Sequence, residues 1–245
     1  MKTTIKSIIQ HVFRRFGYKI NKLEHASVDP FVVQKELTTA ERPVIFDLGA
    51  HNGRITQKYR DLFPQSLIYC FEPFPKSFQA LTQNMSGDDR TFCHNLALSD
   101  TNGMAVFNSN RSSLTNSLLS TDEYAVAMWG DDKEKFHTET KIRVPTKTLD
   151  SFCHENNIQQ IDLLKMDVQG AEFAVLMGAT DLLKQRRISL IYTELILCPT
   201  YNGQHKLHEY LSFLDSCGYE LLDFYNHTRN QHKLIQADVI FVRSP

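Results

Sequence analysis

The chain has 245 residues, enough to bury one large core, and its 42% hydrophobic and 22% charged residues are the balance of an ordinary globular protein. A formal net charge of −1 and an isoelectric point near 6.8 argue against the basic surface expected of a dedicated nucleic-acid binder. No stretch approaches the roughly 20 apolar residues that a membrane-spanning helix needs. We therefore expect a globular chain that neither spans a membrane nor takes nucleic acid as its main partner.

The five cysteines are scattered along the chain without a Cys-x-x-Cys pair, which argues against a zinc site or a disulfide framework. They are expected to be reduced thiols, mostly buried. The first residues lack the uninterrupted apolar core of a secretory signal. Together these features favour a cytoplasmic protein.

Apolar residues recur at helical spacing from Met1 to about Ile20, with lysines and arginines between them. This pattern predicts a basic amphipathic helix within an N-terminal lead-in, residues 1–40. We favour a helix that packs on the body of the protein. The alternative is a helix that attaches peripherally to an anionic membrane surface or to a partner.

Residues 41–245 are predicted to form one domain, because short apolar runs alternate with helical stretches as in a parallel sheet with crossover helices. The predicted strands are Val44–Asp47, Leu67–Phe71, about Thr91–Leu98, Met104–Asn108, Lys141–Leu149, Ile161–Met166, Ile188–Thr193, Tyr219–Tyr225 and Val239–Arg243. The predicted helices are Ile55–Leu62, Pro75–Met85, Ala171–Leu183, Leu207–Ser216 and one that begins at Leu149.

The stretch around residues 109–140 is polar, and we expect it to be an insertion on the substrate side that contributes no core element. Together with the loop at residues 198–203 it is expected to shape the pocket of the molecule acted on. The aromatic residues Tyr124, Trp129 and Tyr201 either stack on a sugar ring or anchor these loops, and the sequence does not favour one role over the other.

Acidic residues stand where the predicted strands end. Asp47 ends the first strand, Glu72 follows the second, and Asp167 and Glu194 follow two later ones. Ligands of open α/β sheets bind beyond the carboxyl ends of the strands, so these positions are the functional candidates. For Asp167 the simpler alternative is a cap of the helix that follows it.

Two glycines, Gly49 and Gly53, shape the turn after the first strand. Glycine lets the backbone turn sharply and approach a ligand closely, but the Gly-x-Gly-x-x-Gly fingerprint of dinucleotide enzymes is absent. Asp47 would instead offer a carboxylate to the ammonium end of a methionine moiety, while small Gly49 and Ala50 leave room for its chain. Glu72, about 20 residues further on, fits the acid that binds a ribose hydroxyl pair. The alternative for the turn alone is an ordinary strand-to-helix loop.

Several blocks occur in the order of one known family. They are VIFDLGAHNG at Val44–Gly53, FEPFP at Phe71–Pro75, NLALSDTNG at Asn95–Gly103, TLDSF at Thr148–Phe152 and IDLLKMDVQGAE at Ile161–Glu172. Over residues 43–242 the chain resembles the FkbM-type methyltransferase family. It departs from the usual pattern at Gln169, where the family has Glu, which weakens a catalytic role for that position.

The resemblance implies a Rossmann-like class I methyltransferase fold, with a mostly parallel seven-stranded sheet and helices on both faces, and S-adenosylmethionine as the cofactor. It implies a cofactor-binding set of Asp47, Gly49, Ala50, His51, Asn52 and Gly53 near the methionine half, Glu72 with Pro73 at the ribose, and Asn95, Ala97 and Leu98 near the adenine. Related enzymes often methylate hydroxyls of sugars or of polyketide and peptide natural products. We therefore predict O-methylation of a sugar-containing small molecule or glycan precursor.

The sulfonium methyl is already a good electrophile, so the protein mainly aligns an incoming oxygen and removes its proton. Asp167 is the first candidate for the base and Glu194 the second. The two carboxylates could alternatively hold a divalent metal such as Mg²⁺ that binds a substrate hydroxyl, which we do not favour.

Three other functions compete with this prediction. A noncatalytic binding or scaffold protein could retain the fold without a base or a substrate cavity. A nucleotide-sugar oxidoreductase would need the dinucleotide fingerprint and a Tyr-x-x-x-Lys relay, which are absent. A nucleic-acid methyltransferase would be expected to carry an Asn-Pro-Pro-Tyr-like segment for a flipped base, and none is present.

Overall fold

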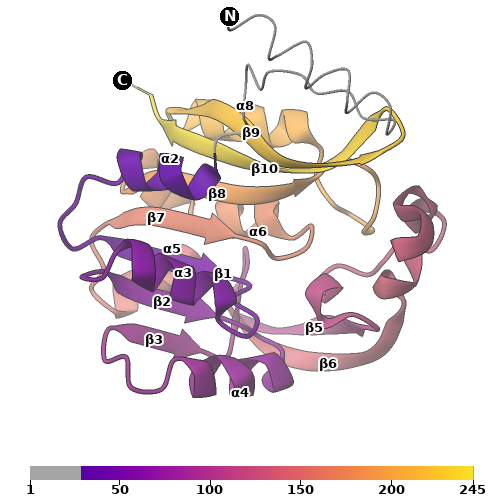
Figure 1. The fold of residues 1–245 in the computed structure, drawn as a ribbon, viewed down its shortest axis with the longest axis horizontal. Coiled ribbons are helices and arrows are strands. Elements are labelled where there is room, and N and C mark those ends of the chain that lie inside the picture. Colours follow the sequence, from indigo (N-terminus) through magenta and orange to yellow (C-terminus); the bar gives the residue numbers. More distant parts are fainter. Residues whose placement is uncertain (1–28, 245) are drawn as a thin grey trace, which may run out of the picture.

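The structure is a computed structural model that describes residues 29–244 of the chain. Its centre is a seven-stranded sheet with helices on both faces (Figure 1). In spatial order the strands are β3 (Thr91–His94), β2 (Leu67–Phe71), β1 (Val44–Leu48), β7 (Ile161–Met166), β8 (Ile188–Ile196), β10 (Lys233–Arg243) and β9 (Tyr219–Asn230). Neighbouring strands are parallel except where β10 runs antiparallel to β8 and β9. The predicted mostly parallel seven-stranded sheet is confirmed.

Each face of the sheet has its own helix layer (Figure 1). Each also has its own hydrophobic core. One layer consists of α2 (Pro30–Leu37), α3 (Arg54–Leu62) and α4 (Pro75–Asn84), and the other of α5 (Leu149–Glu155), α6 (Glu172–Met177), α7 (Thr180–Lys184) and α8 (Leu207–Ser216). Tyr59 and Leu81 are fully buried in the first core, and Leu149 and Leu176 in the second. Strands covered on both faces are mostly apolar on both, which explains why β1 and β7 are mostly apolar.

The strand order reverses between β1 and β7. From β1 the chain enters α3 on one face of the sheet, whereas from β7 it enters α6 on the other. In the register of the sheet Leu48 lies opposite both Phe71 of β2 and Met166 of β7, so the three strands end at one level. Because the connections diverge there, a crevice opens beyond the strand ends.

A second, three-stranded sheet in the order β4-β6-β5 stands beside this crevice (Figure 1). Its strands are β4 (Ala97–Leu98), β5 (Gly103–Asn110) and β6 (Thr138–Lys147), and two 3₁₀ segments, η1 (Ser113–Thr115) and η2 (Ala125–Phe136), connect β5 to β6. The expectation that residues 109–140 contribute no core element is wrong in part. Val126 and Phe136 pack with Tyr201 and Ile235 in a small separate core.

Two predicted elements are divided in the structure. The helix expected over residues 171–183 is split into α6 and α7. At the start of α7 the Asp150 carboxylate accepts the N–H groups of Asp181 and Leu182, both at 3.0 Å. The strand expected over residues 91–98 is split into β3 and β4, which belong to different sheets. Between them the Asn95 amide donates to the carbonyls of Glu72 and Pro73 at 2.8 and 3.1 Å and turns the chain.

Other elements are longer than predicted, or were missed. Strands β8, β9 and β10 all extend past their predicted ends, and the β9-β10 hairpin reaches η2, where Asn230 donates to the Met128 carbonyl at 2.7 Å. Helix α2 was not predicted, although Asp29 caps it by accepting the Phe31 N–H at 2.9 Å. The helix predicted over residues 1–20 lies outside the described residues. Within the described part, no helix is both long and apolar enough to cross a bilayer.

Candidate active site

The turn after β1 is held by backbone contacts to two neighbouring strands. Gly49 and Ala50 both donate their N–H groups to the Phe71 carbonyl at the end of β2, at 3.0 and 3.1 Å. Gly49 has φ +69°, and a Cβ placed on it would lie 1.9 Å from the Asp167 carbonyl oxygen after β7. Only glycine therefore allows the ends of β1, β2 and β7 to come this close.

Asp47 is fully buried below this turn and does not reach the cavity. Its carboxylate accepts the Thr56 hydroxyl at 2.7 Å and forms an ion pair with Lys165 Nζ at 2.9 Å. Lys165 also donates to the carbonyls of Leu48 and Gly49. Burial acts to lower the pKa of Lys165, but the negative charges of Asp47 and Asp167 outweigh it and raise the pKa. Asp47 thus holds the turn through Lys165, and its direct contact with a ligand ammonium gains no support.

Glu72 projects from the end of β2 into the crevice, with 6% of its surface exposed. Its Oε2 accepts the His51 N–H at 2.9 Å and its Oε1 accepts the Phe74 N–H at 2.8 Å. Each carboxylate oxygen therefore has one lone pair left for a further donor. Burial raises the pKa of Glu72 to about 7, and the two N–H bonds limit the rise.

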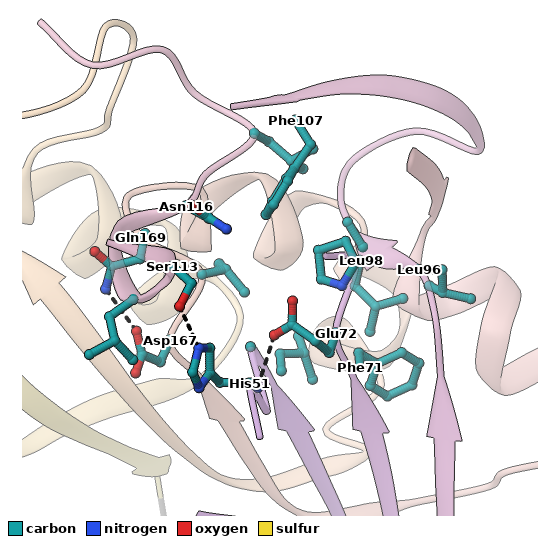
Figure 2. Close-up of a pocket in the computed structure, with 17 residues that line it drawn as sticks. His51, Phe71, Glu72, Leu96, Leu98, Phe107, Ser113, Asn116, Asp167 and Gln169 are labelled. Carbon is teal, nitrogen blue, oxygen red and sulfur yellow. Dashed lines mark hydrogen bonds between the residues drawn. The ribbon is translucent and has the colours of Figure 1, made fainter. Parts of the chain in front are cut away.

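The crevice contains a cavity (Figure 2) with about 630 Å³ of space between protein atoms, part of it open to solvent. Six of the predicted cofactor residues line it, namely Gly49, His51, Glu72, Pro73, Ala97 and Leu98. The other five, Asp47, Ala50, Asn52, Gly53 and Asn95, do not. Two of these five support the cavity from outside it. Gly53, at φ +86°, lets α4 pack against the turn, and Asn95 orients the end of β2.

Part of the cavity wall was not predicted from the sequence, because it comes from β5 and from the polar stretch that follows it. Phe107, Ser113, Asn116 and Leu118 line the side opposite the strand ends. Ser113 Oγ lies 2.9 Å from Nε2 of His51, which ties η1 to the β1 turn (Figure 2). Polarity at residues 109–140 indicated a substrate-side role, but no local signal showed which side chains face inward.

The two predicted catalytic carboxylates are brought together by Gln169. Its Nε2 donates to Asp167 Oδ1 at 2.9 Å and to Glu194 Oε2 at 2.6 Å, and its Oε1 lies 3.2 Å from the Tyr201 hydroxyl oxygen. Gln236 donates to the other oxygen of Glu194. Burial and then the nearby charge of Asp167 raise the pKa of Glu194 well above its usual value.

A polar groove of about 1380 Å³ lies beside Asp167, bordered by α3 and by the carboxyl end of β8. Its wall includes Tyr192, Glu194, Asn226, Gln236 and Asp238, most of them in a hydrogen-bonded network. Asp167 lines both this groove and the smaller cavity. A molecule in each would therefore meet at Asp167.

A model of the family described as the methyltransferase FkbM domain matches residues 47–221. The chain belongs to the FkbM methyltransferase family. Among curated relatives, the 2-O-methyltransferase NoeI of Sinorhizobium fredii (strain NBRC 101917 / NGR234) is 32% identical over 181 residues, which cover 71% of this chain and 72% of that protein. Methyltransferase 1 of Beauveria bassiana (strain ARSEF 2860) is 30% identical over 145 residues, 56% of this chain and 58% of that protein.

Among solved structures, an rRNA methylase from Streptococcus thermophilus aligns with a TM-score of 0.50 and 12% identity, over 90% of this chain and 100% of that one. At this identity the match shows the fold alone. Family and fold together make this chain a methyltransferase with the architecture of S-adenosylmethionine-dependent enzymes, as the sequence predicted.

Three features of the cavity of this FkbM methyltransferase fit S-adenosylmethionine. Glu72 has acceptor capacity for a ribose hydroxyl pair, and Leu96, Leu98 and Phe107 offer apolar surface for an adenine ring. Gly49 leaves the cavity floor without a side chain. For a metal the fit is poorer: among residues 29–244 no group of three or more His, Cys, Asp or Glu side chains is arranged to hold one.

Proposed function

We propose that this protein transfers a methyl group from S-adenosylmethionine to a hydroxyl of a sugar-containing small molecule or glycan precursor. The name of the NoeI relative, a 2-O-methyltransferase, supports oxygen as the methylated atom. The groove beside Asp167 supports a polyhydroxylated acceptor, because amide, hydroxyl and carboxylate groups line it. The net charge of −1 disfavours a nucleic-acid acceptor.

The observation that carries this proposal is the position of Asp167 between two cavities. The smaller one takes the cofactor, with Glu72 on the ribose, Ala97 and Leu98 beside the adenine, and Gly49 and the His51 turn at the methionine half. When bound, the cofactor supplies an electrophilic methyl group. The larger groove then presents the acceptor hydroxyl at the same carboxylate.

Asp167 is the base in this scheme, within hydrogen-bond reach of a hydroxyl presented from the groove. Glu194 is the weaker candidate, because its two oxygens already accept from the amides of Gln169 and Gln236, and its raised pKa shifts it toward the protonated form, which cannot accept a proton. A divalent metal bridging the two carboxylates is also disfavoured, since the Gln169 amide already donates to both. Two further expectations stay predictions: a cytoplasmic location, and peripheral membrane contact through residues 1–20.

The test is a methyl-transfer assay with labelled cofactor and a panel of free sugars, nucleotide sugars and oligosaccharides, alongside calorimetric titration of S-adenosylhomocysteine. We expect Asp167→Asn to lower turnover about 10²- to 10⁴-fold while the affinity for S-adenosylhomocysteine changes little, because Asn keeps the oxygen that accepts from Gln169. Asp215→Asn, at an exposed position of α8, is the control and should match the wild type. A wild-type protein that is folded but binds no S-adenosylhomocysteine would overturn the proposal.

A further inference from the structure

Asn116, in the loop after η1, has one half of its side-chain amide fixed and the other half unpaired. Its Oδ1 accepts the backbone N–H of Asn110 at 2.7 Å. Because an N–H can pair only with the oxygen of the amide, this bond also fixes which end carries the nitrogen. The remaining Nδ2 is buried and has no hydrogen-bond partner among the described residues.

The unpaired nitrogen belongs to the cofactor cavity. Asn116 lines that cavity and has only 8% of its surface exposed, so water competes little for the group. Figure 2 shows the amide nitrogen of Asn116 turned toward the interior of the cavity. Buried donors in folded proteins are nearly always paired with protein, ligand or ordered water, so an unpaired one that faces a cavity marks a position where a bound molecule can supply the acceptor.

The neighbours of Asn116 fix its position along the cavity. Ser117 Oγ donates to the Gln169 carbonyl at 2.7 Å, and the Tyr201 hydroxyl donates to the Thr115 carbonyl at 2.9 Å. Asn116 is therefore held at the end of β7. The apolar wall at Leu96 and Leu98 follows β3, on the far side of β1 and β2.

We propose that Asn116 Nδ2 binds the carboxylate of the methionine moiety of the cofactor, an inference that rests on the proposed cofactor site. With the ribose on Glu72 and the adenine on the apolar wall, the amino-acid half extends toward β7. That half carries an ammonium, which only donates, and a carboxylate, which only accepts. A free amide N–H₂ donates, so the carboxylate is its match.

The test compares two ligands on the full-length protein by calorimetric titration. S-adenosylhomocysteine contains the amino-acid half, and methylthioadenosine lacks it. Asn116→Asp keeps the oxygen that accepts from Asn110 but replaces the donor with a second carboxylate oxygen. We expect the affinity for S-adenosylhomocysteine to fall at least tenfold, while the affinity for methylthioadenosine stays within twofold of the wild type.

Asn102→Asp is the matched control. The Asn102 oxygen also accepts a backbone N–H, that of Thr148 at 2.8 Å, but the side chain is exposed and lies outside the cavity. It should leave both affinities unchanged. If thermal melting shows that Asn116→Asp does not fold, Asn116→Ala removes the donor without adding charge and is expected to give the same selective loss.

Equal losses for both ligands, or no loss for either, would overturn the assignment of the carboxylate to Asn116. Equal losses would place the amide against the adenosine half. Failure of the wild-type protein to bind either ligand would instead contradict the cofactor site itself, so the two failures are distinguishable.

Discussion

The two cavities that meet at Asp167 are built in different ways. The cofactor cavity is walled at its base by short turns after β1, β2 and β3, where backbone groups of neighbouring strands touch. The groove is walled by side chains from α3, β7, β8, β9 and β10, joined by hydrogen bonds. Backbone contacts leave little tolerance for substitution, whereas a side-chain network can change with its ligand. We therefore expect large effects of small changes in the first region and smaller effects in the second.

The largest effect is expected for Gly49→Ala. The added Cβ would lie 1.9 Å from the Asp167 carbonyl, at φ +69°, so the β1 turn or the end of β7 must move. We expect a loss of about 3 kcal/mol or more in the free energy of unfolding, and loss of S-adenosylhomocysteine binding. Thermal melting should show a drop of roughly 6 to 12 °C.

Gly87→Ala is the control that separates the effect of backbone strain from that of the steric clash expected in Gly49→Ala. Gly87 has φ +92° but no atom within 4 Å of the position of a Cβ. It should cost about 1 kcal/mol and leave ligand binding intact. If the two variants behaved alike, strain alone would explain Gly49, and the close approach of strand ends would not be what limits this region.

The next effect is a pH dependence of cofactor binding through Glu72. Its pKa of about 7 means that the carboxylate needed to accept ribose hydroxyls is mostly protonated at pH 6 and mostly ionised at pH 8. The affinity for S-adenosylhomocysteine should therefore rise roughly tenfold between these pH values. Glu72→Gln should bind more weakly, with an affinity that no longer changes over this range.

Glu72 also affects stability in the ligand-free protein, with the opposite sign. Between pH 4.5 and about 7 the folded state holds a proton that the unfolded state has released, so the free energy of unfolding falls as pH rises through this window. The loss is up to about 3 kcal/mol. Urea unfolding at pH 5 and pH 8 should show a larger decrease for the wild type than for Glu72→Gln. A decrease of the same size in both would mean that Glu72 is not the titrating group.

The smallest effect is expected in the groove. Both oxygens of Glu194 already accept from the amides of Gln169 and Gln236, and burial raises its pKa, so Glu194→Gln replaces a group that is poorly placed to take a proton. We expect turnover to fall by no more than about tenfold, and S-adenosylhomocysteine affinity to stay within about threefold of the wild type. A loss as large as that of Asp167→Asn, measured in the same methyl-transfer assay, would make Glu194 the base.

Sequence reasoning was most accurate where structure is local. The β1 turn, the acid after β2 and the strand at residues 161–166 were placed correctly because apolar runs and glycines fix the backbone within a few residues. The division of residues 171–183 into α6 and α7 was missed, because α7 begins where the distant Asp150 carboxylate accepts its N–H groups. The inward position of Asn116 was missed for the same reason, since its loop is held by Gln169 and Tyr201.

By itself the sequence determined the family, the seven-stranded sheet and the positions of acids at the strand ends, because short patterns of neighbouring residues indicate each of these. Only the tertiary structure decided which of those acids face the cavity. Lys165 gave a local signal, a charge within an apolar strand, but its pairing with Asp47 depends on β1 and β7 being neighbours although more than a hundred residues separate them. That ion pair holds the Asp47 carboxylate away from the cavity, whereas Glu72 and Asp167 line it.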